Sequence, residues 1–171
     1  GYDVFRANQR EAVDGALAKR DCLVVLPTGG GKSLCYQIPA ACGAGLVLVV
    51  SPLIALMDDQ VAGAREAGLT AGALHSHVSS AEKMRLRDAA RSGDLHLLYV
   101  SPERLCVGDL LGELKDVLAL IAVDEAHCVS HWGHDFRPEF RQLRPLFDSV
   151  PKVPRMALTA TATPQVQEDI V

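Results

Sequence analysis

The sequence predicts a single α/β domain, residues 1–171, built on a mostly parallel sheet with helices on both faces. Short apolar runs alternate with segments of helical spacing along the whole chain, as in successive β-α units. Residues 46–50 are apolar at every position, which is typical of a parallel strand buried on both faces. A glycine-rich turn, Gly29 to Gly31, separates one predicted strand from the next helix, and such turns place functional groups at the carboxyl ends of strands.

The elements of the first half follow from hydrophobic spacing and breakers. A helix is predicted within residues 1–20, because apolar or buried positions recur at helical intervals there. The members of that stripe are Phe5, Gln9, Ala12, Val13, Ala16 and Leu17. Gly43 and Gly45 end a second helix, and Ser51-Pro52 ends the strand that follows. The predicted order is strand 21–26, helix 32–42, strand 46–50, helix 54–68 and strand 70–74.

The second half continues the alternation. Ser80 is predicted as the N-cap of a helix that ends at Ser92. Four basic residues on this helix are interpreted as a solvated face; they are Lys83, Arg85, Arg87 and Arg91. The remaining elements are strand 95–100, helix 108–115, strand 118–123, helix 138–147 and strand 156–158. Thr163 with Pro164 then reads as the cap and first residue of a final helix.

Composition limits the function classes. One domain of 171 residues is long enough for a real core. No apolar run is long enough to span a bilayer, and no signal-peptide pattern is found. The five cysteines form no Cys-x-x-Cys pair, so neither disulfides nor a zinc site is indicated; most are expected to be small buried hydrophobes in a reducing cytosol. The net charge of −4 predicts either no nucleic-acid binding or only part of a binding groove.

The stretch from Leu23 to Gln37 carries the strongest local signal. An apolar strand ends at Pro27, three glycines follow, and Lys32-Ser33 open a helix. This order is typical of a P-loop, in which backbone amides and a helix N-terminus hold phosphates, a lysine reaches the β/γ oxygens and a hydroxyl binds Mg²⁺. Leu26 stands where the motif usually begins with glycine, and a purely structural glycine turn is the alternative.

A second signal follows the apolar run 118–123. Asp124 and Glu125 leave a predicted buried strand, where unpaired carboxylates are costly. Together with the P-loop they indicate a Walker B element, in which Asp124 holds Mg²⁺ and Glu125 orients and deprotonates the attacking water. An exposed acidic turn is the alternative. His127 is interpreted as a coupling residue, or else as a hydrogen-bonded core histidine.

These motifs, taken in order, resemble those of the RecQ-family DNA helicases of superfamily two. The resemblance covers the whole chain and is most specific at residues 124–140, which are similar to the family's aromatic-rich loop. It implies a RecA-like fold, use of ATP and Mg²⁺, and 3′-to-5′ translocation on single-stranded DNA with unwinding of duplex. The other matching segments are 27–33, 34–37, 51–60, 101–105 and 158–162.

The resemblance also assigns roles to single residues. It implies adenine recognition by Tyr2, Arg6 and Gln9, whereas the residues alone favour a hydrophobic staple of Tyr2 and Phe5. It places the phosphates on Thr28, Gly29, Gly30, Gly31, Lys32 and Ser33, with Lys32, Asp124, Glu125 and His127 in catalysis. It assigns DNA binding or coupling to Ser51, Ser101, Trp132, His134, Phe136, Arg137, Thr159 and Thr161. Each of the serines and threonines could equally be a helix N-cap.

Departures and open alternatives complete the prediction. His131 replaces the usual glutamine before the Trp-Gly pair, and Asp58 stands where many family members have lysine. His127, Cys128, His131 and His134 fit no standard zinc spacing. No motifs of a second RecA-like, zinc-binding or winged-helix region follow Thr161, so the fragment alone is expected to be weakly active or inactive. The expected location is the cytoplasm or nucleoid, or the nucleus; the oligomeric state stays open. The rival functions are a non-hydrolysing binding module and a P-loop kinase or transporter ATPase.

Overall fold

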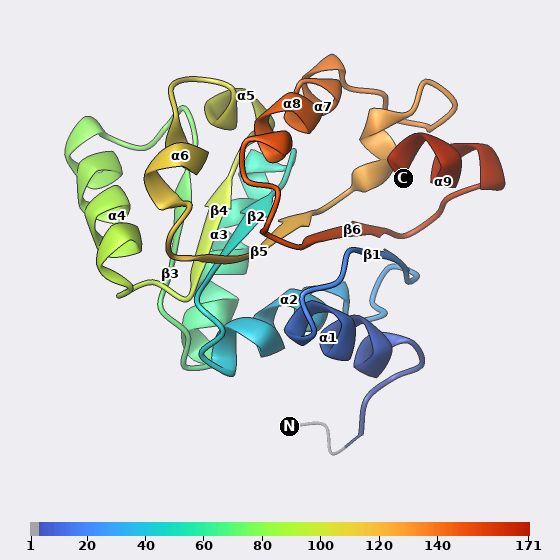
Figure 1. Cartoon of the computed structure of the whole chain (residues 1–171), viewed down its shortest axis with the longest axis horizontal. Coiled ribbons are helices and arrows are strands. Elements are labelled where there is room, and N and C mark those ends of the chain that lie inside the picture. Colours follow the sequence, from blue (N-terminus) through green and yellow to red (C-terminus); the bar gives the residue numbers. More distant parts are fainter. Residues whose placement is uncertain (1–3) are drawn as a thin grey trace.

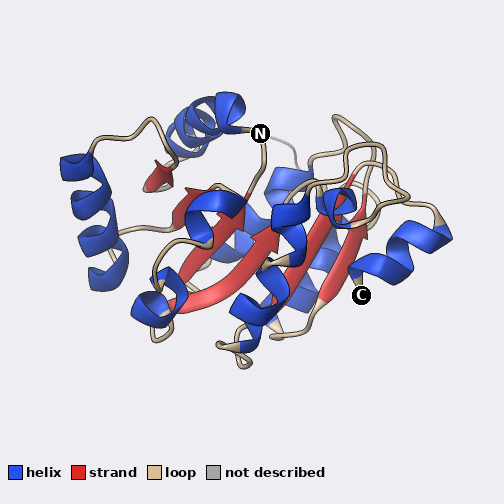
Figure 2. Ribbon diagram, turned by 90° about the horizontal axis from the view of Figure 1, so that it is seen from above, coloured by secondary structure: helices blue, strands red, loops and turns tan. Residues whose placement is uncertain are grey.

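The computed structural model describes residues 4–171 and contains a six-stranded, entirely parallel sheet in the order β1-β6-β5-β2-β4-β3. Helices cover both faces of this sheet (Figures 1 and 2), which confirms the predicted fold class. The strands are β1 Cys22–Val25, β2 Leu46–Val50, β3 Ala71–Leu74, β4 Leu97–Val100, β5 Leu118–Val123 and β6 Arg155–Thr159. Because all strands are parallel, their carboxyl ends lie along one edge.

The helices divide between the two faces. Helices α1 Gln9–Leu17, α2 Lys32–Ala41 and α3 Ile54–Glu66 supply one core cluster. The other face is covered by α4 Ser80–Ser92, α5 Pro102–Leu105, α6 Leu110–Leu114, α7 Pro138–Arg141 and α8 Leu143–Asp148. A 3₁₀ helix, η1 Ala126–Val129, follows β5, and α9 Pro164–Ile170 packs against it. Among the described residues, no helix combines the length and the apolar character needed to cross a membrane.

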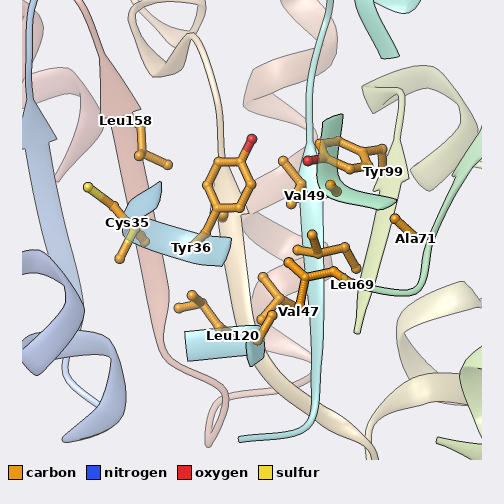
Figure 3. Packing of buried hydrophobic residues seen from close by; sticks show 14 of the residues in the cluster. Cys35, Tyr36, Val47, Val49, Leu69, Ala71, Tyr99, Leu120 and Leu158 are labelled. Carbon is orange, nitrogen blue, oxygen red and sulfur yellow. The ribbon is translucent and has the colours of Figure 1, made fainter. Parts of the chain in front are cut away.

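The continuous apolar run of β2 is explained by burial on both faces. Val47 and Val49 pack toward α1, α2 and α3, whereas the other residues of β2 belong to the opposite cluster. On the first face the rings of Tyr36 and Tyr99 meet edge to face, with centroids 6.3 Å apart (Figure 3). An edge-to-face pair lets the positive rim of one ring meet the negative face of the other. The central strand is therefore covered from both sides.

Strands 46–50 and 118–123 have the predicted bounds, but several helix boundaries were wrong. The first helix begins only at Gln9, because Asn8 has a left-handed backbone with φ 66°. Ser79, and not Ser80, is the N-cap of α4, since its side chain accepts the backbone N–H of Glu82. Residues 138–147 form two helices, α7 and α8, where Pro145 has no N–H to donate to the preceding turn.

Two further predictions differ from the structure or are refined by it. Only Cys35 and Cys128 are buried, so the expectation that most cysteines are buried was wrong. The basic residues of α4 lie on a largely exposed face, as predicted, but several are paired. Arg85 bonds Glu82 on its own helix, whereas Arg87 and Arg91 both bond Glu113 of α6. The face is thus partly neutralised by carboxylates.

Candidate active site

The candidate site lies where three neighbouring strands end. β1 leads into the glycine-rich loop, β6 ends at Thr159, and β5 is followed by Asp124 and Glu125. These strands are adjacent in the order β1-β6-β5, so residues that are far apart in sequence meet at one edge. The next two strands, β2 and β4, end beside Ser51 and Ser101. The glycine-rich loop therefore lies toward one end of this sheet edge, and Ser51 and Ser101 lie toward the other.

The glycine-rich loop has the backbone that a phosphate cradle needs. Gly29 and Gly31 have φ of 76° and 78°, which side-chain-bearing residues rarely adopt. A Cβ on Gly31 would also overlap the Gln9 amide nitrogen. Lys32 opens α2, and its Nζ lies 3.4 Å from the carbonyl oxygen of Leu26. The loop thus leads directly into a helix N-terminus that carries Lys32 and Ser33, with the positive end of the helix dipole facing the loop.

The segment before α1 packs onto this loop. The buried Gln9 amide donates to the carbonyl oxygens of Gly30 and Gly31, at 3.1 Å each. Its Oε1 accepts the backbone N–H of Arg6 at 2.8 Å, and the Arg6 guanidinium donates to the Gly29 carbonyl. Tyr2 lies outside the described residues. In this structure Gln9 and Arg6 support the loop, and their assignment to adenine stays a prediction.

Asp124 is a carboxylate held in an unfavourable environment. Its exposed fraction is 8%, and burial, followed by the nearby Glu125 charge, raises the pKa of the Asp124 carboxyl. The Glu125 N–H, the Lys32 charge and the Gln60 side chain counteract this rise in pKa. A cation placed against this carboxylate would stabilise its charged form. Gln60 of α3 had no role in the sequence prediction, because nothing in the pattern shows that α3 reaches β5.

Glu125 has a strained backbone. Its φ of 51° and ψ of 43° lie in the left-handed region, which is uncommon for a residue other than glycine. Its N–H donates to the Asp124 carboxylate at 2.9 Å, so the turn reverses sharply after β5. Strain of this kind is retained at functional sites where the surroundings impose it. The turn holds both carboxylates at the sheet edge.

His127 connects this turn to β6. Its Nδ1 lies 2.9 Å from the Thr159 hydroxyl, which itself donates to the Thr161 carbonyl at 3.1 Å. The Glu125 carboxylate, which can only accept, also lies 3.3 Å from Nδ1, so we assign the proton to Nδ1 of His127 and the accepting role to the Thr159 hydroxyl. Burial, and then the nearby His134, lower the pKa of His127, which favours the neutral imidazole. The two strand ends are thus joined by one buried hydrogen bond.

We expect Thr159→Val to lower the free energy of unfolding by about 1–3 kcal/mol, because the buried Nδ1–H loses its nearer acceptor and keeps only the Glu125 carboxylate, 3.3 Å away. Urea denaturation followed by circular dichroism measures this change. Thr161→Val is the matched control, since only the backbone carbonyl of Thr161 is used. Its free energy of unfolding should change by less than about 0.5 kcal/mol. Equal losses in the two variants would contradict the hydrogen-bond assignment.

The loop between η1 and α7, residues 130–137, is rich in aromatic rings and is called the aromatic loop. The ring of His134 stacks on His127 with centroids 4.2 Å apart, and His131 stacks on Phe136 at 3.7 Å. Trp132, by contrast, is 75% exposed, as expected from its polar surroundings. His131, which stands where the resembled family usually has glutamine, therefore contributes packing inside the loop.

Arg137 secures the far end of this loop. Its guanidinium pairs with Asp135 and lies 3.5 Å from the carbonyl oxygen of Pro52, just before α3. Asp135 also accepts a hydrogen bond from the Cys128 thiol, and burial raises the pKa of that thiol to about 12. Through Arg137 and Pro52 the loop is thus connected to the segment that carries Ser51.

Asp58, which stands where many members of the resembled family have lysine, lies on the exposed side of α3, 3.8 Å from the buried His75.

The two serines are occupied by local hydrogen bonds. Ser101 is buried and is the N-cap of α5, where its hydroxyl accepts the Arg104 N–H at 3.3 Å. Ser51 is also buried, and its hydroxyl accepts the Leu53 N–H at 3.4 Å. The N-cap alternative thus holds for Ser101. Contact of either serine with DNA stays a prediction.

The donor set at the sheet edge suits a hard cation. The Ser33 hydroxyl and the Asp124 carboxylate could supply oxygen ligands, which Mg²⁺ prefers, and a cation would offset the burial that raises the pKa of Asp124. Over residues 4–171, no group of three or more His, Cys, Asp or Glu side chains is placed to hold a metal by itself. A magnesium ion here would need further oxygens from a bound phosphate or water.

Comparison with known sequences gives a consistent result. The profile of the DEAD/DEAH box helicase family matches residues 6–170. The chain is 49% identical over 172 residues to "ATP-dependent DNA helicase RecQ" of Haemophilus influenzae, which covers 100% of this chain and 28% of that protein. It is 45% identical over 173 residues to the protein of the same name from Bacillus subtilis, which covers 99% of this chain and 29% of that protein. The chain thus spans less than a third of these relatives.

Solved structures support the same fold. A crystal structure of the DUF1998 helicase MrfA bound to DNA matches with a TM-score of 0.79 at 21% identity, over 99% of this chain and 26% of that one. The Mycobacterium smegmatis helicase Lhr bound to single-stranded DNA and AMP-PNP matches with a TM-score of 0.76 at 21% identity, over 99% of this chain and 24% of that one. At these identities the likeness concerns the fold alone.

Proposed function

The chain belongs to the DEAD/DEAH box helicase family, and from this premise we propose that it is the ATP-binding, first RecA-like motor domain of a RecQ-type DNA helicase. The full reaction would couple ATP hydrolysis to 3′-to-5′ movement along single-stranded DNA and to strand separation. The observation that carries this proposal is the meeting of the glycine-rich loop, the Asp124-Glu125 turn and the aromatic loop at one sheet edge. The identity of up to 49% to proteins named RecQ supports the choice within the family.

The proposed binding step uses the loop and α2. Amides of residues 28–33 and the N-terminus of α2 would hold the phosphates, with the Lys32 ammonium on the β/γ oxygens. Ser33 and Asp124 would hold Mg²⁺, which neutralises charge that develops on the phosphates. Tyr2, Arg6 and Gln9 would recognise adenine. For that, the Gln9 amide has to exchange at least one of its present bonds to Gly30 and Gly31.

The proposed chemical step belongs to Glu125. Its carboxylate lies beside Asp124 on the strained turn, and its Oε2 is 3.3 Å from His127 Nδ1. A carboxylate in this place orients water and accepts its proton as the γ-phosphate is attacked. His127 then transmits the state of the turn to Thr159 and, through the stack on His134, to the aromatic loop. The site of hydrolysis and the DNA-contacting loop would thus be connected through His127.

The proposed DNA contact belongs to the exposed Trp132, with Phe136, Arg137 and His134 beside it. Aromatic and guanidinium planes stack on unpaired bases without strong sequence preference. The net charge of −4 is not that of a strongly basic domain, so we infer that part of the groove would come from elsewhere in a longer protein. Ser51, Ser101, Thr159 and Thr161 would add contacts or relay motion at this edge.

The isolated chain should hydrolyse ATP slowly or not at all. RecA-like motors close on ATP between two domains, and an arginine supplied from a second domain raises the rate by roughly 10³–10⁵. The test compares ATPase rates, with and without single-stranded DNA, for this chain and for the full-length protein. Strong DNA stimulation of the full-length protein alone supports the proposal. A short chain that responds fully to DNA would contradict it.

We expect Trp132→Ala in the full-length protein to weaken activation by single-stranded DNA about 5- to 100-fold, since stacking of a base on an aromatic ring contributes roughly 1–3 kcal/mol. The measurement is the DNA concentration that gives half-maximal ATPase activity. Met84→Ala is the control, because Met84 is also exposed, at 67%, but lies on α4. A similar loss in both variants would remove the evidence for a DNA-sensing loop.

The main rival is a helicase-like binding module that docks nucleic acid or protein partners without turnover. A P-loop kinase or transporter ATPase is less well supported, because the aromatic loop and the Thr159–Thr161 connection have no task in those reactions. Transfer of phosphate to a small acceptor would favour the kinase. Turnover that depends on Glu125 separates a motor from the binding module.

A further inference from the structure

Ser130, at the start of the aromatic loop, makes a short polar contact with α9. Its side chain is fully buried, and its hydroxyl donates to Oδ2 of Asp169 at 2.6 Å. The two residues are 39 positions apart in sequence, so the bond joins separate elements. An O–H group at this distance from a carboxylate is typical of a charge-assisted hydrogen bond, roughly twice as strong as a neutral one.

The same hydroxyl also fixes the next part of the loop. The backbone N–H of Trp132 donates to Ser130 Oγ at 3.1 Å. A serine hydroxyl has one hydrogen, and here it is directed to Asp169, so a lone pair is left to accept from Trp132. Asp169, Ser130 and Trp132 therefore form one continuous chain of hydrogen bonds. Removal of the first acceptor frees the hydroxyl to rotate away from the last donor.

The Trp132 ring depends on this backbone support. In the described part of the chain, its side chain makes no hydrogen bond and no ring stack, unlike His131, Phe136 and His134. The neighbouring backbone also passes very close to η1, because a Cβ on Gly133 would lie 2.6 Å from the carbonyl oxygen of His127. The position of the ring is therefore set by where the loop backbone is held.

The Ser130–Asp169 bond is the second of two hydrogen bonds that attach η1 and the aromatic loop to the C-terminal part of the chain. η1 and its loop are joined to β6 by His127 and Thr159, and to α9 by Ser130 and Asp169. β6 and α9 are consecutive along the chain, separated only by residues 160–163. The segment that carries Thr159 and Thr161 is thus bonded to the aromatic loop on both of its sides. A shift of this segment would move the loop with it.

We propose that Asp169 is a positioning residue for the aromatic loop, which through Ser130 holds the Trp132 backbone where the ring is presented to single-stranded DNA. The role in DNA contact rests on the proposed function, whereas the positioning itself is a property of the chain alone. Asp169 lies outside the residues assigned to the nucleotide, to Mg²⁺ and to hydrolysis. Its effect passes through Ser130, and it makes α9 part of the connection between the sheet edge and the loop.

The first experiment needs neither DNA nor ATP. Trp132 is the only tryptophan, so the anisotropy decay of its fluorescence reports the motion of this loop in the purified chain. We expect Asp169→Ala and Ser130→Ala each to raise the amplitude of the fast local motion about twofold, because the backbone at Trp132 loses its anchor. Asp169→Asn keeps an oxygen acceptor and should show a smaller rise. Hydrogen exchange at the Trp132 amide should accelerate about tenfold in Asp169→Ala.

The matched control is Glu168→Ala, which removes the same charge from the preceding exposed residue of α9. This variant should leave the anisotropy decay of Trp132 fluorescence and the hydrogen exchange of the Trp132 amide at the wild-type level. Equal changes in Glu168→Ala and Asp169→Ala, or no change in Asp169→Ala, would overturn the proposal. The double variant Ser130→Ala/Asp169→Ala should resemble Ser130→Ala, since Asp169 acts through the Ser130 hydroxyl, which is already absent in that variant; additive effects would also overturn it. Should Asp169→Ala fail to fold, Ser130→Ala and Asp169→Asn give the same test.

The second experiment separates this proposal from the proposed function. In the full-length protein, Asp169→Ala should reduce the ratio of DNA-stimulated to basal ATPase rate about tenfold, and Glu168→Ala should not. A wild-type protein without DNA stimulation would refute the motor function, while the fluorescence and exchange results still decide the positioning role. A clear loop effect with unchanged DNA stimulation would refute the link between Asp169 and DNA contact.

Discussion

Glu125→Gln in the full-length protein is expected to reduce the rate of ATP turnover by about 10²–10⁴-fold, since glutamine keeps the shape of the side chain but cannot accept the proton of the attacking water. Nucleotide affinity should change less than about threefold. The left-handed backbone at this position, with φ 51°, is unaffected by an isosteric change. The measurement is steady-state hydrolysis with saturating single-stranded DNA, together with binding of a fluorescent ATP analogue.

The control for this prediction is Glu66→Gln, at an exposed position at the end of α3. It should retain the wild-type rate. A Glu125→Gln protein that keeps more than about a third of its turnover would exclude Glu125 as the base. Turnover near zero in the wild-type protein under the same conditions would instead favour the non-hydrolysing binding module. The experiment therefore tests the role of Glu125 and the choice between the two functions together.

Lys32→Ala is expected to weaken binding of a fluorescent ATP analogue by about 10–100-fold, because a charge-assisted hydrogen bond to a phosphate contributes roughly 1.5–3 kcal/mol. In the full-length protein, kcat/KM should fall further, by about 10²–10³-fold, since the ammonium also stabilises charge that develops in the transition state. Lys32 lies at the first position of α2, and its charge also acts on Asp124. The variant thus leaves Asp124 without its nearest cationic support.

Binding can be measured on the isolated chain, because the loop and α2 belong to one folded unit. The control is Lys152→Ala, an exposed lysine far in sequence from the loop. It removes the same charge from the protein, so any general effect of net charge on ATP binding will appear in both variants. Unchanged affinity in Lys32→Ala would mean that the glycine-rich turn is structural, the alternative that the sequence alone left open.

Much of the fold could be predicted because its signals are local. A fully apolar strand such as 46–50 is buried on both faces wherever it lies, and the Thr163 hydroxyl caps α9 by accepting the nearby Val166 N–H. The errors fall where a distant contact or a single dihedral decides. Asn8 ends the N-terminal segment through a left-handed φ, and the four-residue helix α5 was not predicted because it has no periodicity to detect.

The sequence by itself predicted which residues could carry the chemistry of this protein. A glycine loop with Lys32-Ser33, a carboxylate pair after a buried strand and an exposed tryptophan in a polar loop are local patterns, because backbone freedom, charge and burial act over a few residues. Only the tertiary structure decided how these parts are connected. The tautomer of His127, the strained turn at Glu125 and the Ser130–Asp169 bond all depend on strands and helices that meet across the sheet edge. Such contacts have no fixed spacing in the chain, so no pattern of residues can reveal them.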